Sequence, residues 1–278
     1  HILADLNKAD SLLASSSANR TPAEMYVSRY AIKALKARVY IWAGNKSEAA
    51  KYAKEVTEGP FRMVKEEKVL QLFMGYAATS ECVWVLNAPK AYLDVRQAFY
   101  PARSTATCNM VRNNYKRLFS TSTFTPTNND YRFQAYFTQT NWGRPIVAFT
   151  KLYDKNYEET QEWQAGRIPG INMIRLPEMY YILAEALYDT DRNASLEALN
   201  TVITARGLQP LSFSEIATPE RFRQVLVDEI KKEYWGEGQI FFTYKRFEMP
   251  MEGLNSKVFE PNDATYILPL PQSEENKD

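Results

Sequence analysis

Residues 175–186 read RLPEMYYILAEA, a proline-led helical pattern from which the rest of the chain can be interpreted. Pro177 suits the first turn of a helix, because the amide hydrogen it lacks would have no intrahelical partner there. Apolar side chains at helical spacing then form one stripe, made of Met179, Ile182, Leu183, Ala186 and Leu187. A polar turn at 189–194 follows, and then a second helix that stops at Gly207. The pattern predicts an antiparallel helical hairpin over residues 177–207.

A similar pattern occurs earlier in the chain. Residues 21–24 (TPAE) read as a capping box with proline at the first helical position, so we predict that a helix begins there. Its predicted inward face consists of Ile32, Leu35, Val39 and Trp42. Residues 44–45 (GN) allow it to stop, and the next helix has a predicted inward face of Ala49, Tyr52, Ala53 and Val56. Small alanine side chains at the contact indicate a second hairpin over 21–59.

The two hairpins share features that are typical of a degenerate tetratricopeptide-type repeat. Both contain alanines at the helix contact, an aromatic residue near the end of the first helix and a terminal glycine. A further helix begins at Pro219 and carries an apolar stripe of Phe222, Val225, Leu226, Ile230 and Tyr234, until glycines at 236 and 238 break it. We therefore predict a mainly α fold in which tetratricopeptide-like hairpins stack into a superhelical scaffold.

The stretch between the helical halves differs in character. The predicted organisation is one domain over 1–278, with a helical scaffold at 1–74 and 173–247 and a long irregular, aromatic-rich insert at 75–172. Residues 81–87 (ECVWVLN) predict one of the few short strands of this insert, and 120–130 are loop-forming in composition. A long irregular segment is usually functional or disordered, and the aromatic content argues against disorder. We expect three tryptophans in the core, because they lie on apolar elements with a regular period: Trp42, Trp84 and Trp235.

Charge and hydropathy exclude two classes of partner. The 278 residues include 34 basic and 33 acidic side chains, for a formal net charge of +1, without a clustered basic face for nucleic acid. No stretch approaches the roughly 20 apolar residues that span a bilayer. The chain begins with His1 rather than Met, so the lack of a visible signal peptide says nothing about location.

Catalytic and metal chemistry lack their usual residues. The sole histidine is His1, which excludes Ser-His-Asp and Cys-His catalysis and histidine-built metal sites. The glycines at 236 and 238 end a helix, whereas a phosphate-binding loop precedes one, and no acidic pair stands out as a glycosidase pair. We therefore expect no catalytic activity, no cofactor and no metal. Cys82 and Cys108 are expected to be unpaired, partly buried thiols, although an oxidising compartment could pair them.

Six segments in order resemble the SusD/RagB family of Bacteroidetes outer-membrane lipoproteins. They are residues 2–6 (ILADL), 31–40 (AIKALKARVY), 81–84 (ECVW), 175–186 with 199–200 and 205–207 after it, 229–246, and 268–274 (LPLPQSE). Two features depart from the family pattern. Members are usually longer at the N-terminus, with a lipidated cysteine and early helices, and Gln239 stands where many have arginine.

The resemblance implies a surface-exposed protein of the outer membrane that does not act as an enzyme. Such a protein sits as a lid over a SusC-like TonB-dependent transporter and passes it oligosaccharides. Membrane attachment would be only through an N-terminal lipid anchor absent from this chain. Peptide capture by the same type of complex, or a helical-repeat scaffold that binds only proteins, remain the alternatives.

Ligand contact is expected in the insert, because loops on a rigid frame carry binding in such folds. The flat face of an aromatic ring matches the C–H face of a pyranose, and neighbouring polar side chains can bond its hydroxyls. Any one of these rings could instead be a core residue. The candidates are Tyr92, Tyr100, Trp142, Tyr153 and Trp163, with Asn141 and Arg144 as polar neighbours. Trp142 and Trp163 have the most polar sequence surroundings. Tyr92 and Tyr100 follow the predicted strand at 81–87, where the family often carries a binding loop.

Overall fold

A computed structural model describes residues 1–14, 26–65, 80–88, 116–120, 130–141, 145–149, 151, 170–253, 257–267 and 269. The chain divides into two compact units, His1–Glu233 and Tyr234–Asp278, and each is considered by itself. The predicted organisation as a single domain with an insert at 75–172 stays a prediction.

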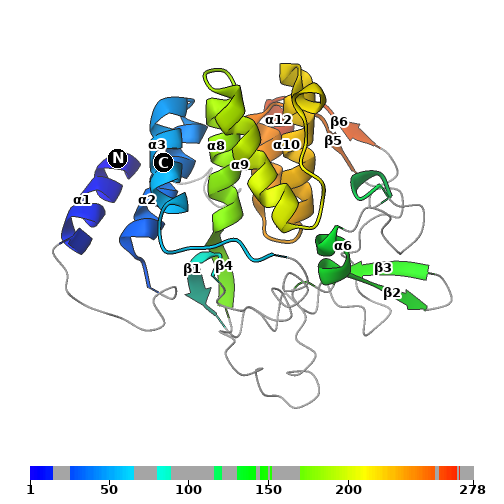
Figure 1. Ribbon diagram of the computed structural model, residues 1–278, viewed down its shortest axis with the longest axis horizontal. Coiled ribbons are helices and arrows are strands. Elements are labelled where there is room, and N and C mark those ends of the chain that lie inside the picture. The colour runs from blue at the N-terminus through cyan, green and yellow to red at the C-terminus, as the bar shows by residue number, and fades with distance from the viewer. Residues whose placement is uncertain are drawn as a thin grey trace, which may run out of the picture. The chain divides into compact units, whose positions relative to one another are not determined.

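The first unit is built mainly from helices (Figure 1). Its longer helices are α1 (Ile2–Ala14), α2 (Arg29–Trp42), α3 (Lys46–Thr57), α8 (Leu176–Leu187), α9 (Arg192–Ala205) and α10 (Pro219–Tyr234). The short elements are α6 (Tyr131–Tyr136), the 3-10 helix η3 (Phe213–Ile216), and strands β1 (Cys82–Asn87), β2 (Phe137–Asn141), β3 (Pro145–Phe149) and β4 (Gly170–Arg175). The predicted mainly α fold with a few short strands is therefore confirmed.

Both predicted helical hairpins are present and they pack in one frame. Helices α2 and α3 form the first hairpin and α8 and α9 the second, while α3 packs against both α2 and α8 (Figure 1). Arg38 of α2 also donates two hydrogen bonds to the Glu178 carboxylate of α8, at 2.6 and 2.7 Å. Glycines with a left-handed backbone follow one helix of each hairpin: Gly44, at φ 74°, lies in the turn between α2 and α3, and Gly207, at φ 87°, follows the end of α9.

The buried face of α2 differs from the predicted one. Its buried residues are Ala31, Ile32, Ala34, Lys36, Ala37 and Ile41, whereas Trp42 is 41% exposed and is not a core residue. The alanine side of the helix lies inward because small side chains let neighbouring backbones approach closely, which turns the bulkier Leu35 and Val39 only halfway in. The helix also begins later than predicted. Ser28 caps it by accepting a hydrogen bond from the Ala31 amide, and residues 26–28 are not helical, while 21–24 lie outside the described ranges.

Helix α8 occupies the centre of the first unit. It is buried around most of its circumference, as expected for a helix with neighbours on several sides, because α2, α3, α9 and β4 all pack against it. The predicted apolar faces of α3, α9 and α10 are largely those that are buried. Burying these faces together forms one continuous helical core.

Strands join the two ends of the insert. β1 pairs antiparallel with β4, and β2 pairs antiparallel with β3 as a hairpin. The predicted strand at 81–87 is thus confirmed, with Trp84 half-buried rather than in the core. Cys82 is buried and its thiol donates a hydrogen bond to Asn172 Oδ1 at 3.2 Å. Cys108 lies outside the described residues, so the pairing of the two cysteines stays a prediction.

The second unit contains α11 (Gln239–Arg246), the antiparallel pair β5 (Met251–Glu252) and β6 (Val258–Phe259), and α12 (Asp263–Tyr266). Gly236 and Gly238, both with positive φ, separate α11 from the helix before it, as predicted. Trp235 beside them is half-buried, not a core residue. Tyr266 packs against Phe241 and donates a hydrogen bond to the Met249 carbonyl. Across the described residues of both units, no helix has the length and apolar character to cross a membrane.

The alanine contact of the first hairpin generates a prediction. Ala53 of α3 is 0% exposed, so Ala53→Leu should lower the free energy of unfolding by about 1–3 kcal/mol, because added methylenes overpack a closed interface. Urea unfolding followed by circular dichroism measures this. Ala4→Leu on the exposed face of α1 is the matched control and should change stability by less than about 0.5 kcal/mol. Equal effects of the two variants would contradict the packing of this hairpin.

Candidate functional site

Most of the predicted ligand contacts lie outside the described residues. They are Tyr92, Tyr100, Trp142, Arg144, Tyr153 and Trp163. Asn141 is the last residue of β2 and its backbone pairs with Pro145 at the start of β3, so 142–144 connect these two strands. The site remains a prediction, and the structure instead describes the segments from which the candidate residues extend.

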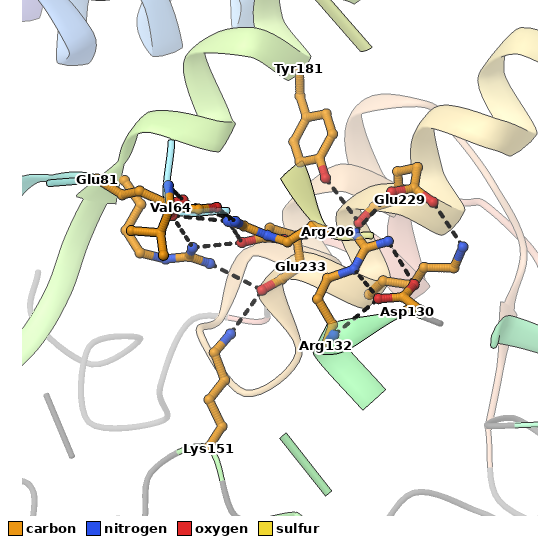
Figure 2. A network of polar contacts seen from close by, with 11 residues as sticks. Val64, Glu81, Asp130, Arg132, Lys151, Tyr181, Arg206, Glu229 and Glu233 are labelled. Carbon is orange, nitrogen blue, oxygen red and sulfur yellow. Dashed lines mark hydrogen bonds and ion pairs between the residues drawn. The ribbon is translucent and has the colours of Figure 1, made fainter. Parts of the chain in front are cut away.

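Buried charged side chains attach each of these described segments to the helical scaffold (Figure 2). The cluster, here called the anchor network, takes residues from the insert and its C-terminal junction (Glu81, Asp130, Arg132, Lys151 and Arg175) and from the scaffold (Arg206, Glu229 and Glu233). Four of the eight are acidic and four are basic, so their formal charges balance. Every one of them is at most 4% exposed.

Arg206, the residue that caps the C-terminus of α9, uses all five of its guanidinium donors. Nε and Nη2 bind the two carboxylate oxygens of Glu233 at 2.9 and 2.8 Å. Nη1 and Nη2 bind the two carboxylate oxygens of Glu81, both at 2.9 Å, and Nη1 also donates to the Val64 carbonyl at 2.9 Å. One planar cation is therefore shared by two carboxylates from distant parts of the chain, in the forked geometry that suits arginine.

Glu233, in the last turn of α10, accepts hydrogen bonds through both its side chain and its backbone. Arg175 Nη1 lies 2.7 Å from the carboxylate, beside the bonds from Arg206. The Glu233 carbonyl accepts from Lys151 Nζ at 2.8 Å and from Arg175 Nη2 at 3.0 Å. The last carbonyls of a helix have no intrahelical donor and carry the negative end of its dipole, so two cations here satisfy the end of α10.

Arg132 makes a second centre beside the first. Its Nε and Nη2 bind the two carboxylate oxygens of Asp130 at 2.9 and 2.8 Å, and its Nη1 binds Glu229 at 2.8 Å. Asp130 is also the N-cap of α6, where it accepts from the Arg132 amide at 3.0 Å. Lys232, at the edge of the cluster, donates to Glu229 at 2.8 Å. The start of α6 is thus fixed to the middle of α10.

The local electrostatics keep these acids ionised. Burial alone would raise the pKa of Glu229, but the charges of Arg132 and Lys232 and their hydrogen bonds outweigh it and lower the pKa to about 2. For Glu233, burial also acts upward, and the charges of Arg206 and Arg175 outweigh it, so its pKa lies well below the usual range. A general acid needs a raised pKa, so neither carboxyl is suited to protonate a leaving group near neutral pH.

The anchor network is therefore structural in its chemistry. Its charged atoms face one another rather than solvent, and removing one partner of a buried ion pair typically costs about 3–5 kcal/mol, because the remaining charge stays desolvated. Within the described ranges, no group of three His, Cys, Asp or Glu side chains is arranged to hold a metal ion. What the network can do is hold the flanks of the insert in fixed positions on the scaffold.

Sequence reasoning did not identify this network, although part of its signal was readable. Phe222, Leu226, Glu229 and Glu233 are spaced by four, three and four residues, so both carboxylates share the apolar face of α10. Acidic side chains on a buried face require buried cations. The identity of those cations could not be read from spacing, because they come from four distant segments.

Comparison with known proteins adds to this geometry. The model of the SusD family matches residues 93–278, more than half of the chain. No protein of curated function matches the sequence.

Solved structures from Bacteroides share the fold. A SusD-like carbohydrate binding protein from Bacteroides vulgatus aligns with a TM-score of 0.72, 16% identity, and coverage of 98% of this chain and 62% of its own. A SusD superfamily protein from Bacteroides thetaiotaomicron aligns with a TM-score of 0.71 and 23% identity, over 99% of this chain and 63% of its own. A SusD-like protein from Bacteroides fragilis aligns with a TM-score of 0.64 and 18% identity, over 98% of this chain and 67% of its own. The chain thus spans less than two thirds of the length of the first two structures.

The lowered pKa of Glu229 generates a prediction about acid stability. Because its pKa in the folded protein is about 2, below the ordinary 4.5, the ionised form contributes stability that is fully present above pH 4.5 and is lost as the pH falls toward 2. The contribution is about 3 kcal/mol at neutral pH. The difference in unfolding free energy between wild type and Glu229→Gln should therefore shrink between pH 4.5 and 2, as measured by urea titration at several pH values.

The exposed Glu197→Gln of α9 serves as the control for this prediction and should change stability little at any of these pH values. A difference between wild type and Glu229→Gln that stays constant from pH 6 to 2 would show that the ionised carboxylate is not what stabilises the cluster.

Proposed function

This chain belongs to the SusD family, and we propose that it is a cell-surface binding protein that captures oligosaccharides. The observation that carries the proposal is the fold shared with a SusD-like carbohydrate binding protein over 98% of this chain. A fold alone does not specify a ligand, so the proposal also draws on the side chains of the insert. The near-neutral chain, with a formal charge of +1, suits an uncharged ligand.

We further propose that the captured sugar passes to a SusC-like TonB-dependent transporter in the outer membrane, over which the protein sits. Attachment to that membrane through an N-terminal lipid anchor, outside these 278 residues, is part of the same proposal. Co-purification of the full-length protein with the transporter from outer membranes, before and after removal of the anchor cysteine, tests both parts.

The proposed contacts are the aromatic residues of the insert, Tyr92, Tyr100, Trp142, Tyr153 and Trp163, with Asn141 and Arg144 beside them. Trp142 and Arg144 follow β2 directly, and Tyr153 comes two residues after the buried Lys151. The segments that carry Trp142 and Tyr153 therefore begin next to residues held by the sheet pairing and by the anchor network. A loop whose ends are already fixed loses less entropy on binding, which supports a binding role for these two segments.

Substitution of the two tryptophans tests the site. Trp142→Ala and Trp163→Ala should each weaken glycan binding by about 2 kcal/mol, roughly thirtyfold, while the melting temperature changes little, because an exposed stacking platform contributes to binding rather than to folding. A glycan microarray identifies a bound sugar, and calorimetry with that sugar gives the affinities. A core ring would instead cost about 3–5 kcal/mol of stability.

Trp42→Ala is the matched control, because Trp42 is a partly exposed indole on the helical scaffold. It should leave affinity unchanged. If Trp142→Ala and Trp163→Ala both lower the melting temperature, or if neither alters affinity for any sugar that the wild type binds, the proposed site is wrong. Binding of peptides in place of sugars would instead favour the peptide-capture alternative.

We also propose that the protein is not an enzyme, and the ionised state of Glu229 and Glu233 supports this for the acidic residues of the anchor network. Incubation of the purified protein with the sugar it binds should release no reducing ends over a day, as followed by a reducing-sugar assay. Turnover above the buffer blank that disappears on substitution of one carboxylate would show a glycosidase.

A further inference from the structure

Lys151 is a buried lysine in a position that demands an explanation. It is 1% exposed, two residues beyond the end of β3, and its Nζ donates to the Glu233 carbonyl at 2.8 Å (Figure 2). Its ammonium also lies 4.3 Å from the centre of the Tyr136 ring at the end of α6. Burying an ammonium is costly unless it is bound on several sides, so a residue of this kind persists where its contacts achieve something that an apolar side chain would not.

The contacts of Lys151 join three segments that sequence separates. The lysine itself follows the β2–β3 hairpin, Tyr136 belongs to α6, and Glu233 lies in the last turn of α10 of the scaffold. The carbonyl that accepts from Lys151 also accepts from Arg175, the last residue of β4. The C-terminus of α10 is therefore a single point at which the hairpin side and the C-terminal side of the insert are both attached.

We propose that Lys151 is a positioning residue: it fixes the end of the β2–β3 hairpin and α6 to the end of α10. A cation suits this role better than an apolar residue, because the helix dipole and the unpaired helix carbonyls attract it to one place. An apolar side chain of the same length would fill the volume without specifying a direction. Lys151 thus contributes to where the β2–β3 hairpin lies more than to whether the scaffold folds.

The chain offers a closely matched control. Lys36 of α2 is also a buried lysine, 3% exposed, and its Nζ lies 3.2 Å from Asp10 Oδ2 and 5.1 Å from the centre of the Tyr52 ring. Like Lys151, it places its ammonium against an oxygen acceptor and an aromatic face, but the acceptor is the Asp10 carboxylate rather than a backbone carbonyl, and the contacts lie within the helices of the scaffold. Lys36→Met and Lys151→Met remove the same charge and keep a similar stem.

Hydrogen–deuterium exchange of the full chain compares the two variants without any ligand. In Lys151→Met, amides of 145–151 and of α6 should exchange at least about tenfold faster, while those of α3 stay within about twofold of wild type. In Lys36→Met the amides of α3 should instead exchange at least about tenfold faster, while those of 145–151 and of α6 stay within about twofold of wild type. Lys151→Arg, which keeps the cation, should restore most of the protection. Faster exchange throughout the chain in Lys151→Met, α3 included, would assign the lysine to general stability and overturn the proposal, as would an absence of change.

A second readout rests on the proposed function. Native gels that contain xylan, mannan or β-glucan give an apparent affinity from the retardation of the protein. This affinity should be at least about tenfold lower for Lys151→Met than for wild type, and Lys36→Met should be retarded as strongly as wild type. Equal retardation of wild type and Lys151→Met would overturn the positioning role. Failure of the wild type itself on all three polysaccharides would count against the proposed function for these glycans, and the exchange pattern would then decide the inference alone.

Discussion

The paired binding of Arg206 to Glu81 and Glu233 is the interaction on which the first unit depends. Five hydrogen bonds leave that guanidinium without a spare donor, so none of its partners can move alone. Glu81 lies just before β1, Arg206 follows the last residue of α9 and Glu233 lies in the last turn of α10, and the loss of any one would leave buried charge uncompensated. The desolvation free energy of burying these ions is offset only when all of these segments are packed together. A charged cluster of this kind specifies one arrangement more strictly than an apolar contact of the same size, because charge pairs require direction as well as proximity.

Two kinds of interaction therefore stabilise the first unit. The hairpins α2–α3 and α8–α9 are held by small apolar side chains, such as Ala34, Ala37 and Ala53, which allow close helix contact over a long face. The insert has few such faces among its described residues, and its short strands pair only two by two. Two-stranded pairs are marginal by themselves in water. The anchor network supplies what they lack, an attachment to the scaffold through buried ion pairs and hydrogen bonds.

The helical scaffold could be predicted from sequence because its signals are local. Pro177, the alanines of α3 and the glycines after the helices each act over a few residues, and both hairpins are present, although the first helix begins at Arg29 rather than near residue 21. Local signals failed where tertiary packing chose among faces: Trp42 was predicted inside, but the alanine side of α2 turned inward instead. The network could not be assembled from sequence, since Arg132 and Arg206 bind partners as far as 142 residues away. The candidate site rests on composition and on a family resemblance, which indicate a chemistry and a segment but no geometry.

The convergence of charges on the end of α10 has a consequence for how such a protein can diversify. The network residues of the insert lie next to intervening segments: Lys151 precedes residues 152–169, and Asp130 and Arg132 follow residues 121–129. Exchange of a whole intervening segment for one of another length or composition would leave in place the hydrogen bonds described above among the network residues. The intervening segments could therefore change in evolution without a change to these buried contacts. Under the proposed function, such exchange would alter ligand preference, and selection on stability would require only that the network residues on either side still reach their partners.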